Sequence, residues 1–192
     1  MRKYAITLPL VLVFAVMMTA CGRPPQAEMD MARADVMRAE NTPNAVTYAA
    51  NTLSLARTAL VRMEEEAGAR RFDAARTLAM EASALAERAI SEGSAAAFLA
   101  REEAAALVSG LGAPIQDATN ALNAARQAGT VSLDFDVLSW DLDWVRRNYN
   151  DARQSLEDND YQTAIAHGQN ARALLADVNA RINDAAQLLA RK

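Results

Sequence analysis

The chain has 192 residues, with 20 lysine and arginine residues against 24 acidic ones, which gives a formal net charge of −4. This acidic balance argues against broad nucleic-acid binding, which needs clustered cations, and against direct electrostatic docking of the chain on anionic lipid. The single cysteine excludes an intramolecular disulfide, so the stability of the fold must come from packing. Alanine occupies 44 positions, and because it is the best helix former the composition predicts an all-α fold.

The first segment, residues 1–20, has the pattern of a secretory signal peptide. Arg2 and Lys3 precede an apolar run over residues 5–18, which is shorter than the roughly 20 residues that a spanning helix needs. We therefore expect this segment to be removed on export. Its removal takes away Arg2 and Lys3 and moves the net charge from −4 to −6.

The four residues Met18, Thr19, Ala20 and Cys21 resemble the lipobox of bacterial lipoproteins. The resemblance implies that the Cys21 thiol carries diacylglycerol, that the chain is cut before it, and that a fatty acid such as palmitate acylates the new amino terminus. Gly22 follows instead of an aspartate, which implies the periplasmic face of the outer membrane. The alternatives are an ordinary secreted protein and a retained amino-terminal anchor.

Residues 21–26 form a short tether because Pro24 and Pro25 cannot enter a helix interior. Residues 27–192 are expected to form a single all-helical domain. Thr42 is predicted as an N-cap with Pro43 in the first turn of the next helix. Apolar spacings of three and four predict about six to seven helices. Their expected ranges are 27–40, 43–67, 71–92, 115–128, 134–158 and 161–189. The helix over 71–92 is expected to continue with a bend to residue 108, and residues 110–114 are expected to form a break.

The segments at about 43–92 and 132–181 form an internal repeat displaced by 89 positions, because Arg70-Arg71-Phe72-Asp73-Ala74-Ala75 aligns with Asn159-Asp160-Tyr161-Gln162-Thr163-Ala164. An aromatic residue at the turn, followed by alanines, resembles the second half of a tetratricopeptide repeat. The resemblance implies antiparallel helical hairpins that form a bundle or a short tetratricopeptide-like stack. The same pattern looks like a poorly characterised family of alanine-rich helical envelope lipoproteins, some of which occur beside peptidoglycan-binding domains.

Residues 133–149 hold both tryptophans of the chain. Trp140 and Trp144 are four apart and share a helix face, whereas Phe135 and Tyr149 can face the core. One interpretation is a central helix packed on all sides. The other is a partner or ligand surface formed by Phe135, Trp140, Trp144 and Tyr149, with the two tryptophans as anchors.

Other candidate sites have structural interpretations. The aspartates at 134, 136, 141 and 143 lack the glycine and distal glutamate of a calcium loop, so no metal is predicted, and Asp134 and Asp136 are expected to stabilise the positive end of a helix. His167 aligns with Leu78 in the repeat, which predicts a partly buried, structural side chain. The methionines at 29, 31 and 37 are expected in the core, and no cofactor is predicted.

These observations favour a non-enzymatic, lipid-anchored scaffold or adaptor at the periplasmic face of the outer membrane, which binds another envelope protein. The alternative is a carrier of a small hydrophobic ligand that works with a periplasmic solute-binding protein, with its cavity near Trp140 and Trp144. An enzyme acting on peptidoglycan is a third class, but the sequence offers no acid pair, metal cluster or catalytic triad for it.

Overall fold

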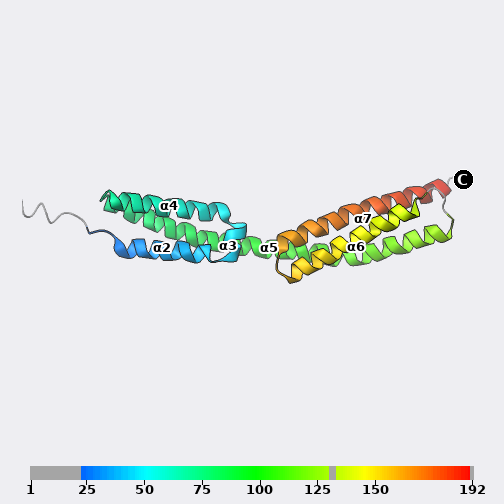
Figure 1. Cartoon of the computed structure of the whole chain (residues 1–192), viewed down its shortest axis with the longest axis horizontal. Coiled ribbons are helices and arrows are strands. Elements are labelled where there is room, and N and C mark those ends of the chain that lie inside the picture. The colour runs from blue at the N-terminus through cyan, green and yellow to red at the C-terminus, as the bar shows by residue number, and fades with distance from the viewer. Residues whose placement is uncertain (1–22, 130–132, 191–192) are drawn as a thin grey trace, which may run out of the picture. The chain divides into compact units, whose positions relative to one another are not determined.

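The computed structural model describes residues 23–129 and 133–190, which confirm the predicted all-α fold and contain no strand. The predicted signal peptide and Cys21 lie outside these residues. None of the helices described is both long and apolar enough to cross a membrane. The helices are α2 (Gln26–Glu40), α3 (Pro43–Tyr48), α4 (Ala50–Gly68), α5 (Phe72–Gln127), α6 (Phe135–Glu157) and α7 (Tyr161–Ala190) (Figure 1).

The described residues group into two compact units, one up to residue 95 and one from residue 96 on. The single domain over 27–192 stays a prediction. The first unit contains α2, α3, α4 and the part of α5 up to residue 95. The second unit contains the rest of α5 together with α6 and α7.

In the first unit, α2, α4 and the first part of α5 form an antiparallel bundle. Ion pairs join Arg57 to Glu40 at 2.6 Å and Arg33 to Glu64 at 3.2 Å, so α2 and α4 run in opposite directions. Alanine dominates the core, which lets the helices approach closely. The buried core residues are Met29, Ala32, Val36, Ala39, Ala45, Ala49, Leu53, Ala56, Ala59, Met63, Ala75, Leu78, Ala79, Ala82, Ala86 and Ala89.

Two methionines that were predicted in this core lie at the surface. Met29 is buried as expected, but Met31 is 59% exposed and Met37 is 61% exposed. The buried stripe of α2 consists of Met29, Ala32, Val36 and Ala39. Met31 and Met37 each stand one position from a member of this stripe, which turns their side chains about 100° around the helix axis. Methionine composition alone therefore misplaced two of the three.

The predicted helix over 43–67 is divided at Ala49, whose backbone departs from helical geometry (φ −125°, ψ 31°). No helix-breaking residue stands there, so the pattern gave no sign of the division. Pro43 occupies the first turn of α3 as predicted. The Thr42 hydroxyl does not cap α3, because it donates to the Arg38 carbonyl oxygen at 2.8 Å.

The predicted break at residues 110–114 is wrong, since α5 continues through Gly110, Gly112 and Pro114. The predicted continuation past Gly93 is confirmed. The two glycines cost about 1 kcal/mol each in a helix, and Pro114 costs about 3 kcal/mol. The apolar stripe that runs through this stretch and beyond is buried in the second core, and this packing offsets the local cost.

In the second unit, the later part of α5 packs antiparallel to α6, and α6 packs antiparallel to α7. Arg146 Nη2 donates to Thr119 Oγ1 at 2.8 Å, and Arg181 pairs with Asp141 at 3.3 Å. This core has larger side chains than the first. It consists of Leu111, Ile115, Ala118, Leu122, Leu138, Leu142, Val145, Ala171, Leu175, Val178 and Ile182.

Candidate functional site

An exposed aromatic surface lies on α6. Trp140 is 71% exposed, Trp144 is 53% exposed, and Val137 one turn earlier is also exposed. We call Val137, Trp140 and Trp144 the aromatic face. The spacings of three and four place the three side chains along one side of the helix, opposite the buried stripe. Helix α6 is therefore not enclosed on all sides.

The other two predicted site residues do not share this surface. Phe135 and Tyr149 are half-buried and pack against the core of the second unit. The Arg126 guanidinium lies 5.4 Å from the Phe135 ring centre, and that of Arg153 lies 6.0 Å from the Tyr149 ring centre. The structure thus splits the four predicted residues into two exposed tryptophans and two core-facing rings.

The start of α6 is set by its capping residue. The Asp134 side chain accepts a hydrogen bond from the Val137 backbone N–H at 3.1 Å, as predicted for an acid at the positive helix end. Asp136 lies in the first turn. This capping fixes where the helix begins. The side that Val137, Trp140 and Trp144 occupy follows from their spacing relative to the buried residues of α6.

Two side chains that the sequence reasoning missed support the aromatic face. The Arg147 guanidinium lies 5.0 Å from the Trp144 ring centre, which holds that indole by a cation–π contact. Asn148 is only 9% exposed, and its Nδ2 donates to the Trp144 carbonyl oxygen at 2.9 Å. Asn148 continues the three-and-four spacing of the buried apolar residues of α6, so its burial could have been predicted from the sequence.

Asn148 also links α6 to α7. Its Oδ1 lies 3.4 Å from His167 Nδ1, and His167 is partly buried as predicted. A buried amide needs partners for its donor and its acceptor, and the Trp144 carbonyl and the imidazole supply them. The contact therefore holds the segment of α6 that carries Trp144 against its neighbouring helix.

The acidic side chains around the aromatic face form surface ion pairs. Asp143 pairs with Arg146 at 2.9 Å, and Asp141 pairs with Arg181, which also contacts Asp177 at 2.7 Å. In the part of the chain that the structure describes, no group of three or more histidine, cysteine, aspartate or glutamate side chains is placed to hold a metal ion.

An apolar cavity of about 440 Å³ lies between α5 and α7 in the second unit. Pro114 has no N–H, so the Gly110 carbonyl at the same wall lacks the usual helical donor. Glu103 at the rim accepts a hydrogen bond from Gln169 at 3.3 Å. The lining residues are Glu103, Ala106, Leu107, Gly110, Leu111, Pro114, Arg172 and Leu175, so neither tryptophan contributes.

Two carboxylates of the first unit have pKa values lowered by hydrogen bonds. The Thr52 hydroxyl donates to Glu92 at 2.6 Å and Arg88 donates to it at 2.7 Å, which lowers the Glu92 pKa. A hydrogen bond from Arg71 lowers the pKa of Glu66. Both contacts keep the carboxylates charged at neutral pH and tie helices or turns together, so their role is structural.

The comparisons with known proteins carry no assigned activity. Residues 27–109 match a family described as a domain of unknown function, DUF4398. No curated protein and no solved structure matches the chain at a significant level. The matched segment includes α2, α3, α4 and the part of α5 up to residue 109, and it ends before the aromatic face. The chain is a helical protein that over this segment is similar to a poorly characterised family.

Proposed function

We propose that this protein is a lipid-anchored helical adaptor at the periplasmic face of the outer membrane. In this proposal fatty acids on Cys21 hold the chain at the bilayer, and the aromatic face binds another envelope protein. The support for the anchor is the signal-peptide pattern of residues 1–20 and the lipobox resemblance that ends at Cys21. Three acyl chains bind a membrane firmly, whereas a single chain binds reversibly.

The observation that carries the adaptor role is the exposure of two neighbouring indoles, Trp140 at 71% and Trp144 at 53%. Tryptophan is among the residues that dominate binding energy when a partner covers them, because one ring offers a large rigid apolar area. Arg147 contacts the Trp144 ring and Asn148 donates to the Trp144 backbone carbonyl, so this part of the aromatic face is ordered without a partner. A preorganised surface loses less conformational entropy on binding.

The adaptor role is tested by capture of partners from envelope extract with the tagged, full-length protein and its Trp140→Ala/Trp144→Ala variant. The matched control is Leu55→Ala/Val61→Ala, which removes two exposed apolar side chains from α4. We expect the tryptophan variant to lose at least about tenfold in capture of a specific partner at both low and high salt, because the contact is apolar. Equal capture by both variants, or no partner above background in either salt, contradicts the proposal.

The anchor is tested separately by mass spectrometry of the protein purified from its native membrane. The expected amino-terminal peptide begins at Cys21 and carries diacylglycerol and an amide-linked fatty acid. An intact residue 1–20 segment, or a free thiol at Cys21, overturns this part of the proposal.

A carrier of a small hydrophobic ligand, working with a periplasmic solute-binding protein, is the second candidate. The observation in its favour is the cavity between α5 and α7, because about 440 Å³ of apolar space is within the usual size of a ligand pocket. We expect a bound fatty acid or similar apolar ligand to raise the unfolding temperature, and Ala106→Leu to abolish that rise by filling the cavity. A panel of such ligands without any rise removes the carrier role.

A further inference from the structure

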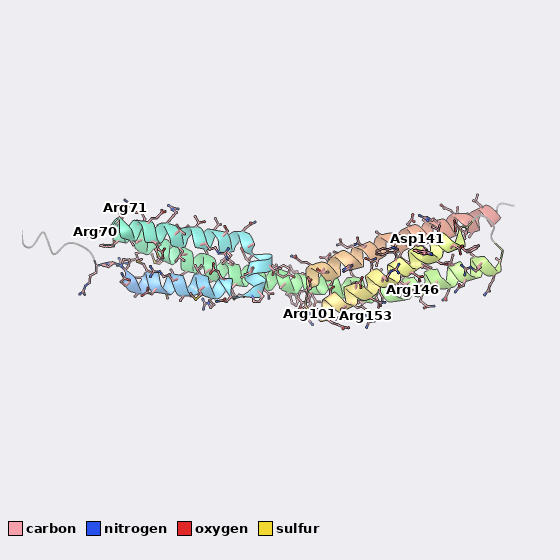
Figure 2. All side chains as sticks on the ribbon, in the orientation of Figure 1. Arg70, Arg71, Arg101, Asp141, Arg146 and Arg153 are labelled. Atoms are coloured by element: carbon pink, nitrogen blue, oxygen red, sulfur yellow. The ribbon has the colours of Figure 1, made fainter. Side chains whose placement is uncertain are left out.

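One end of the first unit carries both the start of α2 and the turn between α4 and α5. Arg76 pairs with Glu28 at 3.1 Å and Arg33 pairs with Glu64 at 3.2 Å, so the first turns of α2 lie beside the end of α4 and the start of α5. Figure 2 shows Arg70 and Arg71 at this end of the unit. We call residues 23–33 together with 62–76 the turn end.

The turn end is the part of the first unit that lies closest along the chain to Cys21. Gln26 stands five positions after Cys21, and even a fully extended chain spans at most about 18 Å over five positions. Asn41 follows the opposite end of α2, which lies about 22 Å from the start of this 15-residue helix. A lipid on Cys21 therefore restrains the turn end to the neighbourhood of the bilayer surface much more strongly than it restrains Asn41.

Three arginines at the turn end have no carboxylate within ion-pair distance among the described residues. The other arginines there are paired: Arg33 with Asp30 and Glu64, Arg71 with Glu66, and Arg76 with Glu28 and Asp73. Among the acidic residues of the turn end, Glu65 has no arginine within ion-pair distance among the described residues. The unpaired arginines are Arg23, Arg62 and Arg70, the second of which also lowers the pKa of the nearby Glu66 carboxylate.

Arg70 occupies a backbone conformation that favours glycine, with φ at 60°. The repeat-equivalent position holds Asn159, a residue that adopts this conformation readily, and its side chain accepts a hydrogen bond from the Tyr161 hydroxyl at 2.8 Å. Arg70 makes no corresponding contact. The left-handed backbone belongs to the turn itself, since Asn159 shares it. The exposed Arg70 guanidinium makes no hydrogen bond or ion pair with the described residues, so its donors are available to a group outside the chain.

We propose that the turn end docks on anionic phospholipid headgroups through the guanidinium groups of Arg23, Arg62 and Arg70. This inference rests on the proposed acylation of Cys21, which brings these groups to the surface. The chain as a whole is acidic, but salt screens charges beyond about 8–10 Å, so the charges nearest the bilayer decide the contact. Arginine binds phosphate oxygens through two parallel N–H groups, which suits phosphodiester headgroups.

The test uses full-length acylated protein in vesicles of phosphatidylethanolamine and phosphatidylglycerol that contain a headgroup-labelled acceptor lipid. Acylation consumes the single cysteine, so Ala69→Cys provides a unique site for a donor dye beside Arg70, and Asn41→Cys provides the control site. We expect stronger energy transfer from position 69 than from position 41. We also expect high salt, or vesicles of phosphatidylcholine, to reduce the transfer from position 69 alone.

The arginines are tested with Arg23→Gln/Arg62→Gln/Arg70→Gln in the dye-labelled protein. Each removed arginine should lower the ratio of docked to undocked turn ends about fivefold, so the triple variant should match wild type in phosphatidylcholine. The control Arg38→Gln/Arg88→Gln/Arg101→Gln removes three exposed arginines that lie outside the turn end, and it should behave as wild type. Equal transfer from positions 69 and 41, or an unaffected triple variant, overturns the docking.

Vesicle flotation separates this failure from failure of the anchor. An acylated triple variant that floats with the vesicles but shows unchanged transfer overturns the docking alone. Protein that is not acylated at Cys21 and does not float overturns the anchor and the docking with it. The unfolding temperature of each variant in detergent shows whether its fold is intact.

Discussion

Arg70 and Asn159, 89 positions apart, have the same left-handed backbone, with φ of 60° and 62°. The hydrogen bonds around them also correspond. Arg71 N–H donates to the Glu66 carbonyl at 2.9 Å, and Asp160 N–H donates to the Ser155 carbonyl at 2.9 Å. The next helices begin at Phe72 and Tyr161, again 89 positions apart. Each turn therefore ends one helix and starts the next with the same backbone device.

Replacement of Arg70 by glycine should stabilise the first unit. A left-handed residue other than glycine costs roughly 1–2 kcal/mol, so Arg70→Gly should raise the free energy of unfolding by about 1 kcal/mol. Asn159→Gly should gain less, because asparagine tolerates the conformation and its bond to Tyr161 is lost. Chemical unfolding of each variant measures both effects. Arg70→Ala is the control, and a gain as large as that of Arg70→Gly would show that charge, not backbone strain, is responsible.

Two glycines of α5 should respond in opposite ways to alanine. A Cβ at Gly93 would lie 2.5 Å from the Asn44 carbonyl oxygen and 2.7 Å from the Ala45 Cα, which are backbone atoms of α3 that cannot rotate away. We expect Gly93→Ala to lower the free energy of unfolding by about 1–3 kcal/mol. Gly110→Ala meets no atom within 4 Å and should raise it by about 0.5–1 kcal/mol. A gain at position 93 in the same assay would show that α3 moves aside at little cost.

Pro114 should be a destabilising residue that packing tolerates. Pro114→Ala supplies an N–H that can donate to the Gly110 carbonyl and removes the clash of the ring with the preceding turn, so we expect a gain of about 1–3 kcal/mol in the second unit. Pro43→Ala is the matched control because a proline at the first position of a helix breaks no hydrogen bond. Thermal unfolding followed by circular dichroism compares them, and equal effects of the two substitutions would refute the explanation.

The Glu92 contact should make the first unit less stable in acid. Hydrogen bonds from Thr52 and Arg88 lower the Glu92 pKa below its ordinary 4.5 in the folded chain. The charged Glu92 side chain therefore contributes fully to the free energy of unfolding above pH 4.5, and this contribution is lost as the pH falls through the lowered pKa. Glu92→Gln should therefore show a smaller loss of stability than wild type between neutral pH and a pH of about 3.

Unfolding of Glu92→Gln at both pH values is compared with that of Glu81→Gln, an exposed position on the same helix. The control should lose as much stability in acid as wild type. Thr52→Val should reduce the acid sensitivity as well, since the hydrogen bond from the Thr52 hydroxyl makes the largest contribution to the lowered Glu92 pKa. Identical losses in all four proteins would show that this contact has no part in acid sensitivity.

The helical content and the hairpin turns could be predicted from local features. Alanine propensity and apolar spacings of three and four identified helices close to α2, α6 and α7, and the aromatic residues Phe72 and Tyr161 marked where two helices begin. His167 was expected to be partly buried because it aligns with Leu78, and it is. These features depend on residues within one or two helical turns, so the sequence alone contains them.

The sites could be predicted only in part. The segment around Trp140 and Trp144 was recognisable by composition, but whether its rings are buried depends on which neighbouring helices cover each side of α6. The same holds for the division at Ala49, where α3 lies against Gly93, forty-four positions further on. The roles of Arg147 and Asn148 likewise required the positions of Trp144 and His167.

By itself, the sequence determined that the chain beyond the predicted tether is helical, where its hairpins turn, and that no intramolecular disulfide joins its parts. Only the tertiary structure decided that α5 runs unbroken through Pro114, that the helices group into two units, and that both indoles remain exposed. The reason is physical. Propensity and capping act between residues up to four positions apart, whereas burial depends on helices that are distant in sequence and whose packing offsets local costs of a few kcal/mol.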